Sequence, residues 1–129
     1  MEMELQDMSR KGMLLDVLSE MSSLERQIVV QAARPWTFLP DTLLDKWDAL
    51  FGGGYGLSNE GFSEDILAIL LEFDSQLESL IEILPADADD KVYYLHYDEV
   101  WRIVRELADW TLSRIAQASQ PVAPELCLN

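Results

Sequence analysis

The sequence has no Lys or Arg between Trp47 and Asp90, although these 44 residues include eleven Asp and Glu residues. The 46 residues before this segment hold eight acids and five bases, and the 39 residues after it hold five acids and four bases. The segment therefore accounts for −11 of the net charge of −15. Such a charge repels nucleic-acid phosphates and anionic membranes, so we expect no direct binding to nucleic acid or to a membrane.

Cysteine and histidine are also scarce, with one residue of each, Cys127 and His96. A single cysteine cannot form an intramolecular disulfide, which favours a reducing compartment, and we expect a cytoplasmic protein. The first residues lack the basic and then apolar pattern of a secretion signal. The longest apolar run, residues 66–71, is too short to span a bilayer.

No pattern in the sequence predicts a metal, cofactor or catalytic site. The aspartates of residues 87–90 cannot start a calcium loop, because Lys91 and Val92 stand where an oxygen ligand and a glycine are needed. Residues 52–56 are rich in glycine but follow no predicted strand and lack the Lys-Ser/Thr of a phosphate loop. His96 would need the second half of a di-metal motif, which is absent. We therefore expect that the protein binds no cofactor and no metal and that it is not an enzyme.

The chain is nevertheless rich in apolar residues, at 49% of 129 residues, which suits one domain with a hydrophobic core. Prolines and glycines divide it at four places: Pro35 with Pro40, residues 52–56, Pro85, and Pro121 with Pro124. Apolar residues between these breaks recur every three or four positions, which indicates helices. We predict one all-α domain at residues 1–120, followed by a tail at 121–129. It is a bundle of four to five helices with antiparallel neighbours and a flexible glycine-rich loop after the second or third helix.

Residues 13–34 form either one helix or two in this scheme. Ser22 and Glu25 have the spacing of a capping box, which would begin a second helix there. A single helix is the simpler interpretation, and it is the one that we expect.

The other predicted helices cover residues 41–51, residues 63–84, and a last segment that begins between residues 90 and 98 and ends near 118. Ser63 suits the N-cap of the second of these. That helix has a regular seam of apolar residues: Ile66, Leu70, Phe73, Leu77, Leu80 and Leu84. Residues 93–97 could form the first turns of the last helix, a separate turn or a short strand.

The candidate site lies on the predicted helix 63–84 and just after it. Asp74, Glu78 and Glu82 are spaced by four, so they stack on one side of the helix with no cation on that helix to relieve their repulsion. The last helix instead pairs opposite charges at this spacing, Arg102 with Glu106 and Arg105 with Asp109. The acidic row is either a solvated face or a surface for a basic partner. The residues that would bind such a partner are Leu67, Leu71, Asp74, Glu78, Glu82, Asp87, Asp89, Asp90, Tyr93, Tyr94 and Tyr97.

Leu67 and Leu71 either add an apolar patch beside the acidic row or widen the core. The tyrosines suit an interface, because they bury a large area and keep a hydroxyl for hydrogen bonding. They could equally pack on the bundle.

An acid-capped helix, a proline break, an Asp-rich turn, Tyr93-Tyr94 and a helix with Trp110 follow one another over residues 63–112. This order resembles the immunity proteins of DNase bacteriocins, the colicins and pyocins. The resemblance implies a small four-helix protein that binds the nuclease domain of a toxin. It also implies Asp74, Glu78 and Glu82 as partner-specific charges, and Tyr93 and Tyr94 as anchors. The chain departs from the family at Leu95, where the family has proline, and residues 1–62 have no obvious counterpart.

The function that we predict is therefore an acidic inhibitor or immunity-type protein. It would bind and neutralise a basic protein, such as a nuclease toxin or another nucleic-acid-binding protein. A phage-type inhibitor would use the same physics. The alternative is a helical adaptor or secretion chaperone that binds partner helices through an apolar groove. The sequence leaves open whether the protein is a monomer or a dimer.

Overall fold

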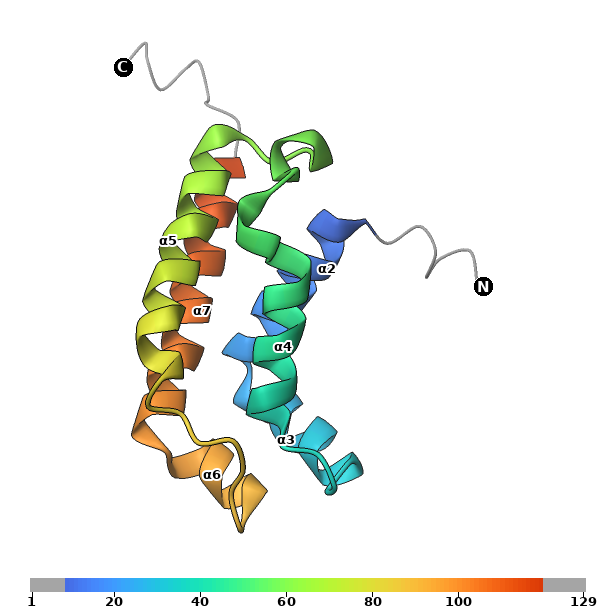
Figure 1. Cartoon of the computed structure of the whole chain (residues 1–129), viewed down its shortest axis with the longest axis vertical. Coiled ribbons are helices and arrows are strands. Elements are labelled where there is room, and N and C mark those ends of the chain that lie inside the picture. Colours follow the sequence, from blue (N-terminus) through green and yellow to red (C-terminus); the bar gives the residue numbers. More distant parts are fainter. Residues whose placement is uncertain (1–8, 120–129) are drawn as a thin grey trace, which may run out of the picture.

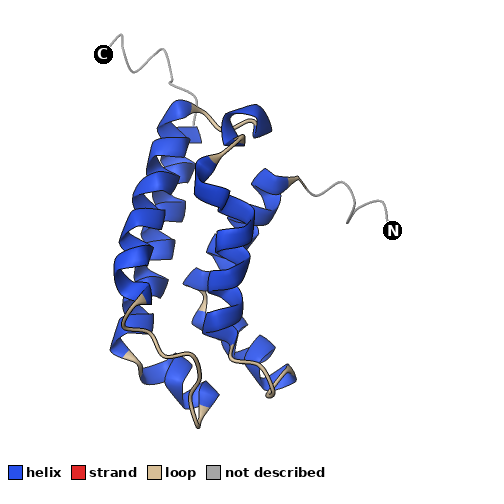
Figure 2. Ribbon diagram, in the orientation of Figure 1, coloured by secondary structure: helices blue, strands red, loops and turns tan. Residues whose placement is uncertain are grey.

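A computed structural model describes residues 9–119, and this part of the chain contains helices and no strand. Its α-helices are α2 (Arg10–Ser22), α3 (Leu24–Ala33), α4 (Leu39–Phe51), α5 (Glu64–Ile81), α6 (Lys91–Tyr97) and α7 (Glu99–Ser119). The all-α class is confirmed (Figure 2). The described part has six α-helices instead of the four to five predicted. None of them combines the length and apolar character that a bilayer-spanning helix needs. The predicted tail at 121–129 and Cys127 lie outside the described residues.

The helices form an elongated bundle in which α5 and α7 run antiparallel along one side, while α2, α3 and α4 make up the other (Figure 1). The helix α2 packs on both α7 and α4 and so joins the two sides. The core is continuous between them, and its largest fully buried side chains are Trp47, Trp101, Phe51 and Phe73. The inward residues of α5 predicted from the seam, Ile66, Leu70, Phe73 and Leu77, are buried. Leu80 and Leu84 are only partly buried.

Residues 13–34 form two helices, so the prediction of one long helix was wrong. The break is at Ser23, whose backbone is extended, with φ of −113° and ψ of 106°. The Ser23 hydroxyl accepts a hydrogen bond from the Arg26 N–H at 3.2 Å. Ser22, the residue proposed as the cap, instead donates its hydroxyl to the Ser19 carbonyl. An N-cap serine contributes about 1 kcal/mol to helix stability.

The Gln27 side chain explains why the chain breaks at this point. Its amide nitrogen donates to the carbonyls of Glu20 and Met21, at 2.8 and 2.7 Å, which lie in the last turn of α2. Its amide oxygen accepts a hydrogen bond from the Trp101 indole N–H at 2.9 Å. Helix-end carbonyls lack partners within the helix and need other donors when they are buried. Gln27, fully buried, therefore supplies those donors and links the break to α7.

The predicted flexible loop in the glycine-rich segment is not confirmed. The segment forms two short 3-10 turns, Gly52–Gly54 and Leu57–Glu60. The Arg10 guanidinium binds this segment and the end of α4 by donating to the carbonyls of Leu50, Phe51 and Tyr55, at 2.6, 2.7 and 2.6 Å. Gly52 and Gly56 have φ of +55° and +76°, and a Cβ on either would lie 3.4 Å from Arg10. Glycine is needed there for the left-handed backbone and for the close approach of the arginine.

The ends of the other helices differ from the predictions by a few residues. Helix α4 begins at Leu39, before Asp41, because Pro40 is suited to the first turn. The Ser63 hydroxyl caps α5 as predicted, by accepting from the Ile66 N–H. Helix α5 ends at Ile81, before Pro85 is reached, and residues 82–84 form turns.

The last predicted helix is also two helices. Residues 93–97 belong to the short helix α6, which is separate from α7. Of the three alternatives for this segment, the separate turn is therefore the one that the structure has. The Asp98 carboxylate caps the start of α7 by accepting a hydrogen bond from the Trp101 N–H at 2.8 Å. The pair Arg102–Glu106 forms as predicted, at 2.8 Å. The pair Arg105–Asp109 does not, because Arg105 donates to the Leu95 carbonyl at the end of α6.

Replacement of Gln27 by leucine tests the role of this amide. The variant keeps the side-chain size but removes the partner of the Trp101 N–H and of the Met21 carbonyl, while the Glu20 carbonyl keeps the Ser23 N–H, so we expect a loss of about 3 kcal/mol in the free energy of unfolding. Urea denaturation followed by circular dichroism measures it. The control is Gln76→Leu at an exposed position of α5, which we expect to change stability by less than about 0.5 kcal/mol. Equal effects of the two substitutions would contradict the role of Gln27.

Candidate protein-binding surface

The predicted partner-binding residues fall into two groups in the structure. Those at the end of α5, in the connection to α6 and in α6 lie at one end of the bundle, the lower end in Figure 1. We call the exposed members of this group the acidic end: Glu78, Glu82, Asp87, Asp89, Asp90, Tyr93 and Tyr97. Asp74, Tyr94, Leu67 and Leu71 lie elsewhere or take part in internal contacts.

Asp74 does not belong to an exposed acidic row. It is half-buried, and its carboxylate accepts a hydrogen bond from the Trp47 indole N–H at 2.8 Å. The Trp47 ring stacks on Phe51 at 5.0 Å and meets Phe73 edge-on at 4.9 Å, so this indole lies in the centre of the core. Asp74 therefore holds α5 against α4. The sequence does not reveal this, because Asp74 has the same spacing as Glu78 and Glu82.

Glu78 and Glu82 are exposed, and neither forms an ion pair within residues 9–119. Glu72 on the same helix is different, because it lies 3.1 Å from Arg114 of α7. Two further residues of this region, Ile81 and Ile83, are large and exposed. Our sequence analysis missed both, although each stands beside Glu82 and off the apolar seam. The end of α5 thus presents negative charge together with exposed apolar side chains.

Leu67 and Leu71 are separated from this group. Leu67 is half-buried against the core, and Leu71 is exposed by 45%. Both leucines lie close to Gly54, since a Cβ placed on that glycine would be 3.5 Å from the Leu71 side chain and 3.9 Å from the Leu67 side chain. Leu67 precedes Glu82 by 15 residues of helix and turn, which corresponds to about 22 Å. These leucines hold the glycine segment and do not flank the tyrosines.

The aspartates between α5 and α6 have distinct roles. Asp87 lies 3.4 Å from the Lys91 ammonium and accepts from the Ala88 N–H. Asp90 caps α6 by accepting from the Tyr93 N–H at 3.0 Å. Asp89 is exposed and forms no ion pair in the described part of the chain. Within residues 9–119, no group of three or more His, Cys, Asp or Glu side chains could hold a metal ion.

The three tyrosines of α6 divide into an exposed pair and an inner residue. Tyr93 and Tyr97 are exposed by 62% and 67%, and their ring centroids lie 4.7 Å apart. Tyr94 is half-buried and meets Phe38 edge-on at 5.1 Å. The resemblance implied Tyr93 and Tyr94 as the anchors. The structure instead exposes Tyr93 and Tyr97 together, because residues four apart share one face of a helix.

The Tyr94 hydroxyl is buried and no hydrogen bond of good geometry reaches it among the described residues, although the Asp98 carboxylate lies close enough to act on it. Burial raises the pKa of this hydroxyl well above its ordinary value of 10.0, and the neighbouring Asp98 carboxylate raises it further. The neutral hydroxyl is therefore the form that the folded protein holds.

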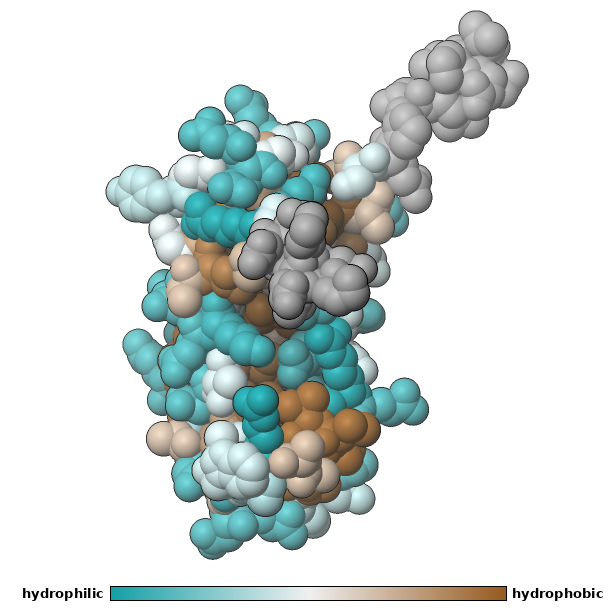
Figure 3. Space-filling model, turned by 90° about the vertical axis from the view of Figure 1, so that its right-hand side faces the viewer, coloured by the Kyte–Doolittle hydropathy of each residue, from teal (hydrophilic) through white to brown (hydrophobic). Residues whose placement is uncertain are grey.

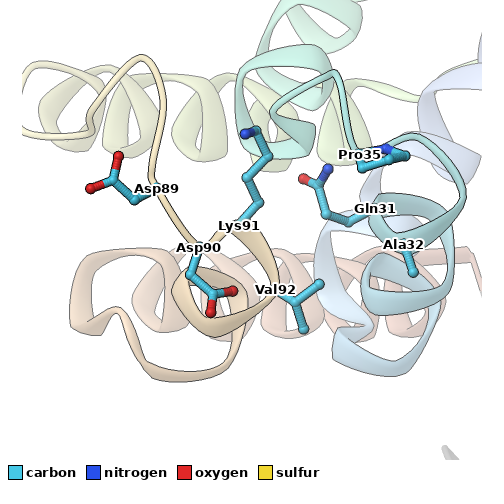
Figure 4. A pocket seen from close by; sticks show the side chains of 7 residues that line it. All are labelled: Gln31, Ala32, Pro35, Asp89, Asp90, Lys91 and Val92. Atoms are coloured by element: carbon cyan, nitrogen blue, oxygen red, sulfur yellow. The ribbon is translucent and has the colours of Figure 1, made fainter.

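Two hollows lie at the acidic end, and Asp90 lines both of them. One, of about 370 Å³, is lined by Ala88, Asp90, Tyr93, Tyr94, Tyr97 and Asp98. The other, of about 270 Å³, separates Gln31, Ala32 and Pro35 from the segment Asp89, Asp90, Lys91 and Val92 (Figure 4). The first combines carboxylates with tyrosine rings, and this combination suits a cationic side chain.

Replacement of Tyr94 by phenylalanine removes a buried hydroxyl that makes no hydrogen bond of good geometry, so we expect a gain of about 1 kcal/mol in the free energy of unfolding. The raised pKa adds a pH effect. Above pH 10 the unfolded tyrosine ionises while the folded one resists ionisation, so the wild type loses stability that Tyr94→Phe retains. Denaturation at pH 7 and at pH 10.5 measures both effects. The exposed Tyr93→Phe is the control, and we expect it to behave as the wild type at both pH values.

Comparison with known proteins gives no match: no family model matches the sequence, and neither a curated protein nor a solved structure is similar to it.

Proposed function

We propose that the protein binds a basic protein through its acidic end and neutralises it, as an immunity-type inhibitor of a nuclease toxin would. The observation that carries the proposal is the composition of this surface. Glu78, Glu82 and Asp89 are exposed, and no cation of residues 9–119 pairs with them. The exposed pair Tyr93 and Tyr97 lies at the same end.

Unpaired carboxylates supply long-range attraction to a basic surface. Repulsion among the acids raises the free energy of the isolated protein, and a cationic partner relieves it. The effect on binding is mainly a faster association, which salt weakens. Some acids elsewhere are already neutralised by a neighbouring cation. Glu99 and Glu106 on α7, for example, already lie 3.0 and 2.8 Å from Arg102.

Apolar contacts would then hold the complex together. Tyr93, Tyr97, Ile81 and Ile83 are large side chains that lose solvent contact when a partner covers them. Aromatic residues at the centre of an interface contribute most of the binding free energy in many complexes. Asp74 and Tyr94, which make contacts inside the bundle, are not part of the proposed contact surface.

The protein would inhibit a nuclease by covering the basic surface to which the nucleic acid binds. A nuclease binds phosphates through basic residues, so an acidic protein that covers these residues excludes the nucleic acid. The resemblance over residues 63–112 to bacteriocin immunity proteins supports this role, and a cytoplasmic location would go with it. An inhibitor of another nucleic-acid-binding protein would use the same surface.

A second candidate function, a helical adaptor or secretion chaperone, is favoured by a groove between α2 and α4. It has a volume of about 300 Å³ and is lined by Met13, Asp16, Val17, Lys46, Ala49 and Leu50. Its walls are mainly apolar, as in grooves that receive the apolar face of a helix. Binding there would depend little on ionic strength, whereas binding at the acidic end would weaken steeply as salt is added.

The double variant Glu78→Lys with Glu82→Lys tests the acidic end. We expect association with basic nuclease domains of bacteriocin toxins to slow at least tenfold, because the net charge of the contact surface changes by four units when two carboxylates become two ammonium groups. Surface plasmon resonance at 50 and 300 mM NaCl measures the rate and its salt dependence.

The matched control is Asp48→Lys with Glu60→Lys, two exposed acids away from the acidic end that change the net charge equally. We expect its association rate to stay within about threefold of the wild-type rate, since distant charges are screened. Equal slowing by both variants would show that only the net charge matters. Undiminished binding by a folded Glu78→Lys, Glu82→Lys protein would exclude the acidic end.

A further inference from the structure

The short helix α6 has an acid at each end and tyrosines between them. Asp90 is its N-cap and Asp98 its C-cap. Both acids and the tyrosines Tyr93, Tyr94 and Tyr97 line the same hollow of about 370 Å³ at the acidic end. Ligand sites in proteins commonly have volumes of about 300 to 1,000 Å³. The hollow thus brings two carboxylates and three aromatic rings together in a space that can receive a side chain.

The backbone fixes both carboxylates of the hollow in place. Asp90 accepts a hydrogen bond from the Tyr93 N–H at 3.0 Å and so caps α6. Asp98 accepts from the Trp101 N–H at 2.8 Å and so caps α7. An ionised carboxylate has two oxygens and accepts several hydrogen bonds, so each acid can keep its cap and bind a cation at the same time. A ligand would not have to order these side chains, which favours binding.

Within residues 9–119, no basic side chain pairs with either carboxylate of the hollow. Lys91 lies 3.4 Å from Asp87, and its side chain points away from Asp90 (Figure 4). Arg102 pairs with two glutamates of α7. Arg105 donates to a carbonyl at the end of α6. The described part of the chain therefore leaves the negative charge of the hollow available to a cation from outside.

The tyrosines give the hollow rings on which a cation can stack. Tyr93 and Tyr97 are exposed, with ring centroids 4.7 Å apart and ring planes inclined by 43°. Tyr94 is held from within by its edge-on contact with Phe38. A cation within about 6 Å of a tyrosine ring is attracted by the negative face of the ring. The planar guanidinium of arginine both stacks on such rings and donates several N–H groups to carboxylates, whereas the ammonium of lysine is a compact point charge.

The face of the molecule that carries α3 has a different chemistry, because apolar side chains gather on its lower part (Figure 3). A cation gains little on such a surface, since covering a charge costs free energy unless an opposite charge or a hydrogen-bond acceptor accompanies it. The hollow at α6 supplies both.

We propose that this hollow holds an arginine side chain of the basic protein partner. The arginine lies over the rings of Tyr93 and Tyr97, and its guanidinium lies between the carboxylates of Asp90 and Asp98. The inference rests on the proposed function, because it names the group of the partner that the acidic end would hold. It also gives the acids two different roles. The exposed glutamates of the acidic end speed association, and the hollow slows dissociation.

Titration of the isotope-labelled full chain with N-acetylarginine methylamide, followed by NMR, tests the hollow without a protein partner. We expect saturable shifts of the amides of Ala88, Tyr93 and Tyr97, with a dissociation constant of about 1 mM. N-acetylcitrulline methylamide has nearly the same shape without the charge and should bind at least tenfold more weakly. N-acetyllysine methylamide should bind at least threefold more weakly. Shifts that do not saturate, or equal binding of the arginine and citrulline derivatives, would overturn the inference.

Variants of the hollow test its residues. Asp90→Asn with Asp98→Asn removes both charges and keeps both caps, because asparagine caps helices as well as aspartate does. We expect this variant to stay folded, as circular dichroism verifies, and to bind the arginine derivative at least fivefold more weakly. Tyr97→Leu, which removes an exposed ring, should weaken binding at least threefold. The matched control, Asp48→Asn with Glu60→Gln, removes two exposed charges elsewhere and should change the dissociation constant less than twofold. Equal binding by the hollow variant and the control would contradict the site.

Binding to bacteriocin nuclease domains separates this inference from the proposed function. Asp90→Asn with Asp98→Asn should raise the dissociation rate of the complex at least tenfold and slow association by less than about threefold. If Glu78→Lys with Glu82→Lys slows association but the asparagine variant dissociates at the wild-type rate, the inference is overturned and the proposed function stands. Binding of the arginine derivative in the hollow, with no binding to any nuclease domain, would support the arginine site and contradict the nuclease partner.

Discussion

The buried amide of Gln27 is the interaction on which the arrangement of the helices depends. It joins the last turn of α2 to Trp101 of α7 through three hydrogen bonds. A buried amide that lost these partners would cost several kcal/mol, so the surrounding helices can adopt few other arrangements. This side chain stabilises the break at Ser23 and ties it to α7, while the buried apolar residues of α2 and α7 pack the two helices together.

Two other long polar side chains act in the same way at other places. Arg10 satisfies carbonyls at the end of α4 and in the glycine segment, and Asp74 satisfies the indole of Trp47. In each case a group of one helix completes hydrogen bonds that another element leaves open. These contacts also decide which charged groups remain available, because Arg10 and Asp74 are used inside the fold while Glu78 and Glu82 are not.

The molecule consequently has two surfaces of opposite chemistry. The acidic end concentrates carboxylates with tyrosines, and the exposed Ile81 and Ile83 lie beside it, whereas the exposed Val29, Ala32 and Ala33 of α3 lie in a segment of the sequence without acids. Clustering the acids in residues 47–90 leaves residues 26–40 without them, so the two surfaces arise from one uneven distribution of charge along the chain. This distribution places unpaired carboxylates at the acidic end, where we propose that they attract a basic protein.

The sequence by itself determined the helical class, the main breaks, the inward seam of α5 and the concentration of acids. These follow from local spacing, from proline and glycine geometry, and from composition, which need no knowledge of the fold. Only the tertiary structure decided that Asp74 points to Trp47, that Tyr97 replaces Tyr94 in the exposed pair, and that α3 buries glutamines. The reason is the distance along the chain. Gln27 and Trp101 are 74 residues apart and Asp74 and Trp47 are 27 apart, and no local pattern shows which polar side chain will find such a partner.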